Sequence, residues 1–209
     1  AEGTYDSLNF YTNGFQVINT DISYNASGGS YLFYAIAANP DTTEPTKANS
    51  FKSILWSGTG SARSVTGLGF KPDLIWWKSR TNHYNWKAVD SVNGPTKNLY
   101  QNLTNTLASD VATTSFDNDG FTFGSGGNGN ASGLSYAGYA WKAGDHDYSI
   151  PQMNAEGGII SLVSANPAAG FSVVKWTGTG VNGKTLGHGL GAAPELIITK
   201  GLFFLLDIK

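Results

Sequence analysis

The most specific chemical motif in the chain is the segment GTGVNGKT at residues 178–185. It fits the phosphate-binding pattern G-x-x-x-x-G-K-[ST], in which backbone amides and one lysine hold phosphates where a helix begins. Gly187, Gly189 and Gly191 follow and then Pro194, and this composition does not support a helix. The segment therefore predicts a loop between strands, and we expect neither nucleotide binding nor any other cofactor.

Metal and acid–base chemistry have weaker signals. Asp117 and Asp119 begin a segment that resembles a calcium loop, but Gly126 occupies the position of the closing acidic ligand. The three histidines lack zinc-site spacing, and the chain has no cysteine and no G-x-S-x-G elbow. We predict no metal site and no catalytic residues. A glycoside hydrolase stays an alternative, which a carboxylate pair facing across a cleft would favour.

Aromatic residues give the positive signal. Sugar rings present apolar C–H faces that stack on aromatic rings, and eight such residues gather in one stretch of the chain: Trp76, Trp77, Tyr84, Trp86, Tyr100, Tyr136, Tyr139 and Trp141. Aromatic residues also build cores, because they bury a large area. Alternation along a strand directs about half of the side chains outward. Trp77, Tyr84 and Trp86 are therefore the candidate ligand-binding residues.

Composition limits the possible partners. The formal net charge is −2, charged residues make up 13% of the chain, and no basic run is present. Phosphate-driven binding of nucleic acid is therefore not expected. The longest purely apolar run, at residues 202–206, is too short to cross a bilayer, so we expect no membrane insertion. Without cysteine, stability must come from packing.

An internal repeat organises these residues. Residues 51–78 match residues 171–200, and residues 13–38 match residues 119–143, in the order of their glycines, prolines and aromatic residues. Both members of the first pair carry Trp-x-Gly-Thr-Gly, and both members of the second carry Asn-Ala-Ser-Gly. The repeat predicts two diverged units.

The order of these segments predicts an unusual domain organisation. Residues 51–143 form one complete unit, whereas residues 1–40 and 159–209 are the two halves of a second unit in swapped order. Either the outer halves close on each other, or the chain is a fragment of a longer array whose neighbouring subunit supplies the missing strands.

Short β-rich runs end in Gly-Thr-Gly turns, and apolar runs follow Pro72 and Pro194, as expected of strands. Residues 98–112 are the single stretch that favours a helical turn. Many short strands separated by glycine turns predict an all-β fold, an antiparallel β-sandwich of the jelly-roll or concanavalin-like type.

The chain resembles a module of tail-fibre and other virion proteins of tailed, marine-type bacteriophages. The residues that carry the resemblance are SLNFYTNGF at 7–15, NASGGSYLFYAIA at 25–37, GFKPDLIWWKSR at 69–80, DSV at 90–92 and the stretch from Ser115 to Ala143. The resemblance implies a concanavalin-like or jelly-roll sandwich on a virus particle. It brings no catalytic residues.

The sequence thus favours a virion surface structural protein, a fibre, spike or decoration subunit, that binds a host-surface glycan or other virion proteins as a homo-oligomer. One alternative is a secreted carbohydrate-binding module or glycan-active enzyme. Another is an architectural virion protein without a ligand. Exposed rings without a carboxylate pair would favour binding, and a surface buried on neighbouring copies would favour architecture.

Overall fold

The computed structural model describes residues 8–18, 25–37, 49–109, 112–125, 127–150 and 152–202 of the chain. Within these ranges the protein has 17 strands and no α-helix, and every sheet is antiparallel, which confirms the prediction of an all-β antiparallel sandwich. The predicted helical turn at 98–112 is wrong. Its described residues end one strand and form the next, and the backbones of these two strands pair with each other, Asn98 with Ala108.

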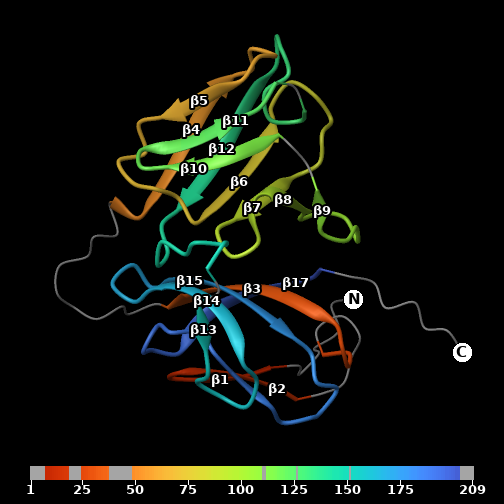
Figure 1. The fold of residues 1–209 in the computed structure, drawn as a ribbon, viewed down its shortest axis with the longest axis vertical. Helices are drawn as coiled ribbons and strands as arrows, with labels where there is room; N and C mark the ends of the chain where they lie inside the picture. Colours follow the sequence, from red (N-terminus) through yellow and green to blue (C-terminus); the bar gives the residue numbers. More distant parts are fainter. Residues whose placement is uncertain are drawn as a thin grey trace, which may run out of the picture.

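Two stacked units make up the molecule (Figure 1). The central unit pairs a six-stranded sheet, in the order β4-β12-β6-β7-β8-β9, with a three-stranded sheet, in the order β10-β11-β5. Its strands are β4 (Phe51–Ser57), β5 (Arg63–Thr66), β6 (Leu74–Ser79), β7 (Lys87–Asp90), β8 (Gly94–Tyr100), β9 (Ala108–Ser109), β10 (Thr113–Asp117), β11 (Gly120–Phe123) and β12 (Ser135–Trp141).

The split unit takes its strands from both ends of the described chain. A five-stranded sheet, in the order β13-β14-β15-β3-β17, faces a three-stranded sheet, in the order β1-β2-β16. The strands are β1 (Leu8–Tyr11), β2 (Gly14–Val17), β3 (Ser30–Ala37), β13 (Met153–Asn154), β14 (Ser161–Asn166), β15 (Phe171–Thr177), β16 (Thr185–Gly187) and β17 (Pro194–Gly201).

The two units share a strand order. The trio β4-β12-β6 of the central unit corresponds to β15-β3-β17 of the split unit, and β10-β11-β5 corresponds to β1-β2-β16. Side chains agree as well. Trp56 stacks on Tyr136 and Trp176 lies against Tyr31, with ring centroids 5.5 and 5.4 Å apart. These correspondences support the interpretation of a diverged repeat with a split second unit, which stays a prediction.

Each sandwich encloses its own aromatic core. Trp56, Trp77, Phe121 and Phe123 pack between the two sheets of the central unit. Phe15, Tyr31, Phe33 and Trp176 do the same in the split unit. These inward positions alternate with outward ones along every long strand, so each large sheet has a second face still to be covered.

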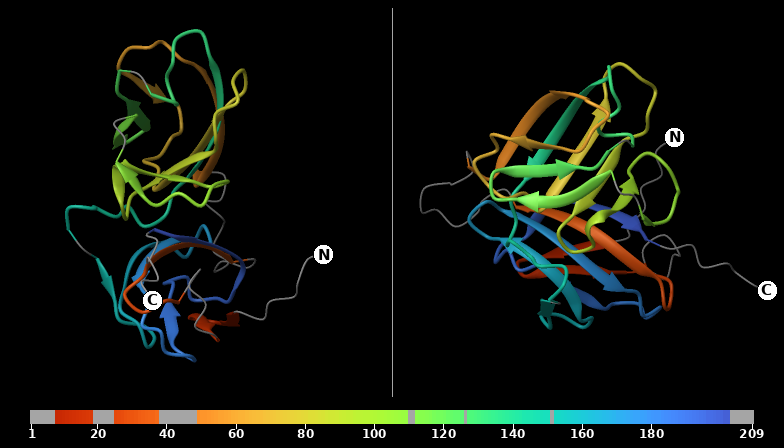
Figure 2. Two further views of the ribbon diagram at one scale, coloured as in Figure 1. Left: turned by 90° about the vertical axis from the view of Figure 1, so that its right-hand side faces the viewer. Right: turned by 45° about the horizontal axis from the view of Figure 1, so that its top comes forward.

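A third apolar cluster joins the units. Leu74, Ala88 and Leu99, on the outer face of the six-stranded sheet, pack against Leu32 and Val173 on the outer face of the five-stranded sheet. Figure 2 shows the two sandwiches stacked through these sheets. The contact covers mainly the β6–β7–β8 part of the outer face, because these three strands carry Leu74, Ala88 and Leu99, and it reaches β12 at Trp141.

A buried carboxylate fastens the connection. Asp73, 1% exposed, accepts hydrogen bonds from the hydroxyls of Ser91 and Ser164, at 2.5 and 2.7 Å. It also accepts bonds from the backbone N–H groups of Ala143, Asp145 and His146, at 2.7, 3.2 and 3.2 Å, all in the segment that connects the units. One side chain of the central unit therefore holds both the connecting segment and β14 of the split unit.

Candidate functional site

The uncovered part of the outer face of the six-stranded sheet is the candidate site. Trp56 and Tyr136 point into the core, so the alternating positions of β4 and β12 point outward. These outward residues include Phe51, Leu55 and Tyr139, whose exposed fractions are 43%, 69% and 37%. An exposed apolar face of this kind is a normal mark of a binding surface.

Three aromatic rings on this face lie nearly parallel. The ring of Tyr139 is 6.3 Å from that of Phe51, with 12° between their planes, and 6.2 Å from that of Trp86, with 19° between the planes. We call Phe51, Tyr139 and Trp86 the aromatic platform. Because Tyr139 stands between its two neighbours, the platform is a row in which each ring is supported by the next.

The platform continues into the contact between the units. Trp141 lies 5.0 Å from Phe51 and 5.6 Å from Trp76, and it stacks on Phe171 of the split unit at 5.9 Å. The split unit therefore closes one end of the row. The rings at that end are held by packing, which limits the rotamers open to the exposed rings beside them.

The residues predicted from the sequence fall in three different places. Trp77 is 1% exposed in the core and donates its indole N–H to the carbonyl of Asn128, so it does not belong to the candidate surface. Trp86 is half-buried and belongs to the platform. Tyr84 is half-buried and has no ring contact within the described residues; it interacts electrostatically with the inward-facing Tyr136.

Sequence reasoning missed Phe51 and did not select Tyr139 over its aromatic neighbours. The alternation of β12 gave a usable signal, because Tyr136 and Tyr139 differ by an odd number of positions and must face opposite sides. Which of the two sides is closed by the small sheet is a property of the tertiary fold.

Residues directly after β8 hold the loop that carries Trp86 by hydrogen bonds. The backbone N–H of Trp86 donates to the side-chain carbonyl of Asn102 at 3.0 Å, and the amide of Asn102 donates to Asn85 at 2.8 Å. The carbonyl of Trp86 accepts the N–H of Gln101 at 3.2 Å. These bonds fix the backbone on both sides of the indole before any ligand arrives.

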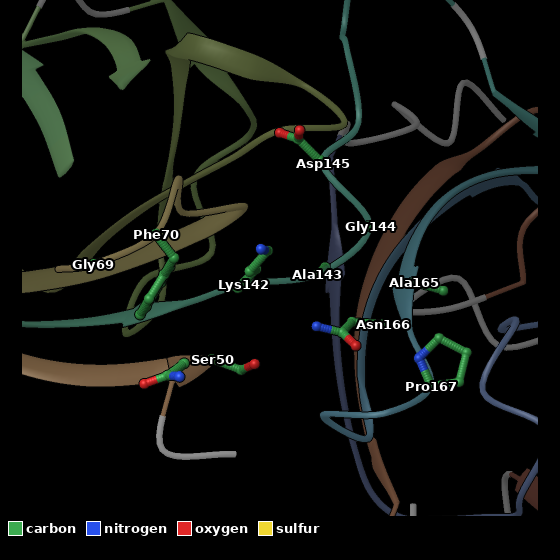
Figure 3. A pocket seen from close by; sticks show the side chains of 11 residues that line it. Ser50, Gly69, Phe70, Lys142, Ala143, Gly144, Asp145, Ala165, Asn166 and Pro167 are labelled. Atoms are coloured by element: carbon green, nitrogen blue, oxygen red, sulfur yellow. The ribbon is translucent and has the colours of Figure 1, made fainter. Parts of the chain in front are cut away.

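A second concave region lies at the junction of the units. This cleft, of about 630 Å³, has Phe70 and Lys142 on the side of the central unit and Ala165, Asn166 and Pro167 on the other, as Figure 3 shows. At its rim Asp145 pairs with Lys71 at 2.9 Å, and the hydrogen bond with Asp145 raises the pKa of that lysine.

The remaining motifs have structural partners. The loop at 178–184 leads into β16 rather than a helix. The carboxylate of Asp119 accepts the N–H groups of Gly69 and Gly67 at 2.6 and 3.0 Å, which lowers its pKa. Within the described ranges no group of three or more His, Asp or Glu side chains is placed to hold a metal ion. Nucleotide binding remains untested, and we keep its absence as a prediction.

Fold and site together define a class: an antiparallel β-sandwich protein with an aromatic platform on the outer face of its larger sheet. The family model of a domain of unknown function (DUF7483) matches residues 46–203, more than half of the chain, and the chain belongs to this family. No curated protein and no solved structure matches it. In the part of the chain that the structure describes, no helix is long and apolar enough to cross a membrane.

Proposed function

We propose that the protein is a virion surface structural protein that binds a glycan on its aromatic platform. The single observation that carries the binding role is the row of near-parallel rings formed by the exposed Phe51 and Tyr139 and the half-buried Trp86. Its place on a phage particle is supported by the resemblance of residues 7–15, 25–37 and 69–80 to virion proteins.

The platform suits a sugar because its aromatic rings can pack against the apolar C–H face of a pyranose. A pyranose buries its C–H face on an aromatic ring and leaves its hydroxyls for polar neighbours. Exposed rings that already stack on one another lose little conformational entropy when a ligand covers them. Water leaves an apolar surface in the process, which favours association.

The outward positions favour binding over hydrolysis. On β4, β12 and β6 these positions are Phe51, Ser53, Leu55, Ser57, Ser135, Ala137, Tyr139, Trp141, Leu74, Trp76 and Lys78. None of them is a carboxylate, whereas a glycosidase needs two about the scissile bond. This supports a binding protein rather than a glycoside hydrolase.

The binding role is tested on a glycan array with the full chain. Trp86→Ala and Tyr139→Ala should each weaken retention at least about tenfold, which corresponds to about 1.4 kcal/mol. Phe10→Ala, which removes an exposed ring from β1 of the split unit, is the matched control and should bind as the parent does. Equal retention by the parent, Trp86→Ala and Tyr139→Ala would contradict the proposal.

The virion role has its own test. Antibodies against the chain should label assembled phage particles from the source of the sequence, and mass spectrometry should find the chain in purified particles. Its absence from purified particles would contradict a virion role and leave glycan binding to be judged on the array alone.

An architectural role is a second candidate, favoured by an apolar surface on the connecting segment and β13–β14. Tyr148, Ile150, Met153 and Ile160 are all more than half exposed. Such a surface is typical of contacts between subunits. Met153→Asp should then reduce the oligomer found by light scattering. A parent chain that is monomeric at every concentration would argue against this role.

A further inference from the structure

Two cations extend the outer face beyond the aromatic platform. Trp76 points outward on β6, so Lys78 and Arg80 follow it on the same side. The pairing of β6 with β12 reaches Arg80, whose N–H donates to the carbonyl of Ser135 at 2.8 Å. Their side chains therefore share a face with Tyr139, on the neighbouring strand.

Register places Lys78 next to Trp86. The pairing of β6 with β7 ends at Trp77 and Lys87, and Lys78 and Trp86 are the residues that come next to this last pair on the two chain segments. The ammonium group and the indole can therefore contact one ligand at the same time.

The cations line a small pocket. A concavity of about 290 Å³ is formed by residues 78–83, with His83 and Asn82 adding N–H donors to those of Lys78 and Arg80. Hydrogen bonds within the loop stabilise it: the hydroxyl of Ser79 accepts the N–H groups of Thr81 and Asn82 at 3.3 and 3.1 Å. The donors are thus presented on a fixed backbone.

No carboxylate neutralises these cations. Among the described residues the single salt bridge of the protein is Lys71–Asp145, at the junction cleft. Lys78, Arg80 and His83 have no acidic partner within those ranges, and no acidic residue lines the pocket. The local positive charge stands against a negative total charge of −2. This charge pattern favours an anion in the pocket.

We infer that the glycan is acidic: its rings stack on the aromatic platform while a carboxylate or sulfate group enters the pocket of Lys78, Arg80 and His83. This inference rests on the proposed function. Arginine offers two parallel N–H groups to such an oxyanion, and lysine adds a point charge. Within the described ranges no acidic side chain competes with the ligand for either cation.

Three dextrans of one backbone test the inference: unmodified, carboxymethylated and sulfated. Biolayer interferometry with the full chain should give at least about tenfold tighter binding to one or both charged forms than to the neutral form. Lys78→Gln/Arg80→Gln should remove that difference. The matched control Lys97→Gln/Lys184→Gln removes the same charge elsewhere on the surface and should retain it.

The outcomes separate the inference from the proposed function. Equal binding of neutral and charged dextrans, with Trp86→Ala still harmful, would overturn the acidic ligand and leave the platform standing. Charge-dependent binding that the control pair reduces as much as Lys78→Gln/Arg80→Gln would also overturn it, because general attraction would then be the cause. Binding that depends on Lys78 and Arg80 but not on Trp86 would support the pocket and contradict the platform. The comparison of carboxylated with sulfated dextran identifies the anionic group.

Discussion

At the scale of single residues, Asp90 shows that burial in the contact between the units disfavours an ionised carboxyl group. It is fully buried on β7 and accepts the backbone N–H groups of Val92 and Asn93 at 3.0 and 2.8 Å. Burial outweighs these bonds and raises its pKa from an ordinary 3.8 to about 6. The folded protein therefore holds a proton that the unfolded chain releases at the same pH.

The sign of the resulting pH dependence follows from linkage. A carboxyl group whose pKa is raised on folding stabilises the fold while it is protonated, and that stability is lost as pH rises from about 4 to about 6. A raised pKa of this size corresponds to about 3 kcal/mol once the group is ionised. Above that window the contribution no longer changes.

Asp90→Asn should consequently stabilise the protein at pH 7 relative to the parent. In the parent the side-chain NH₂ of Asn93 donates to Asp90 at 3.0 Å. The neutral amide keeps an acceptor for the backbone N–H groups of Val92 and Asn93, and a turn of the Asn93 amide brings its Oδ1, which is buried without a hydrogen-bond partner in the described structure, to the new NH₂ group. The free energies of unfolding of parent and variant, measured in urea at pH 4 and pH 7, should differ by about 2 kcal/mol more at pH 7, because the unfolded carboxyl group is already half ionised at pH 4. If the free energies of unfolding of parent and variant changed equally with pH, Asp90 would not be the source of this pH dependence.

At the scale of elements, each Gly-Thr-Gly turn packs directly on an Asn-Ala-Ser-Gly turn. A Cβ atom at Gly58 would lie 2.0 Å from the carbonyl oxygen of Ala131, and one at Gly178 would lie 2.4 Å from that of Ala26. Within the turns the N–H of Gly60 donates to the carbonyl of Asn130 at 2.7 Å. Backbone meets backbone here, so a side chain cannot move aside to make room.

Gly58→Ala should therefore destabilise the central unit by about 3 kcal/mol or more. The comparison is Gly67→Ala, where φ is 90° and nothing lies within 4 Å, so conformational strain alone should cost about 1 kcal/mol. Chemical denaturation of both variants gives the two values. Similar losses would mean that the contact between the turns adds nothing.

Much of the element pattern could be predicted from the sequence, because glycines, prolines and alternation mark strands locally. The Gly-Thr-Gly turns predict the ends of short β-rich runs, and β4 and β15 end at Ser57 and Thr177, directly before Gly58 and Gly178. The faces could not be predicted in the same way. Trp76 and Trp77 are adjacent and equally aromatic, so alternation separates them without saying which is inside. The contact with the split unit, far away in the sequence, then covers Trp76 as well.

At the scale of the whole molecule, an apolar contact and one buried carboxylate connect the two sandwiches. Ser164 belongs to the split unit and donates to Asp73 of the central unit, and its oxygen accepts the N–H groups of Gly144 and His146 at 2.9 and 3.3 Å. Loss of this hydroxyl removes one donor from the buried carboxylate of Asp73 and one acceptor from the N–H groups of Gly144 and His146.

Ser164→Ala should weaken the coupling between the units. We expect a loss of about 2 kcal/mol, the usual cost of buried polar groups left without partners. Calorimetry should then resolve two thermal transitions in place of one. Ser172→Ala is the control, because the hydroxyl of Ser172 is buried and has no hydrogen-bond partner within the described residues. A single transition with unchanged stability in Ser164→Ala would contradict the role of Asp73 as the fastening point.

The most direct measurement is a two-dimensional NMR titration of the ¹⁵N-labelled full chain with an oligosaccharide of the glycan that the array retains best. The chain has six tryptophans, so each indole N–H reports on one place in the fold. We predict that the indole of Trp86 and the backbone amides of Lys78 and Tyr139 shift on binding, while the buried indoles of Trp56, Trp77 and Trp176 do not. Shifts confined to the junction cleft or to the split unit, or no shift at any ligand concentration, would contradict a glycan site on the aromatic platform.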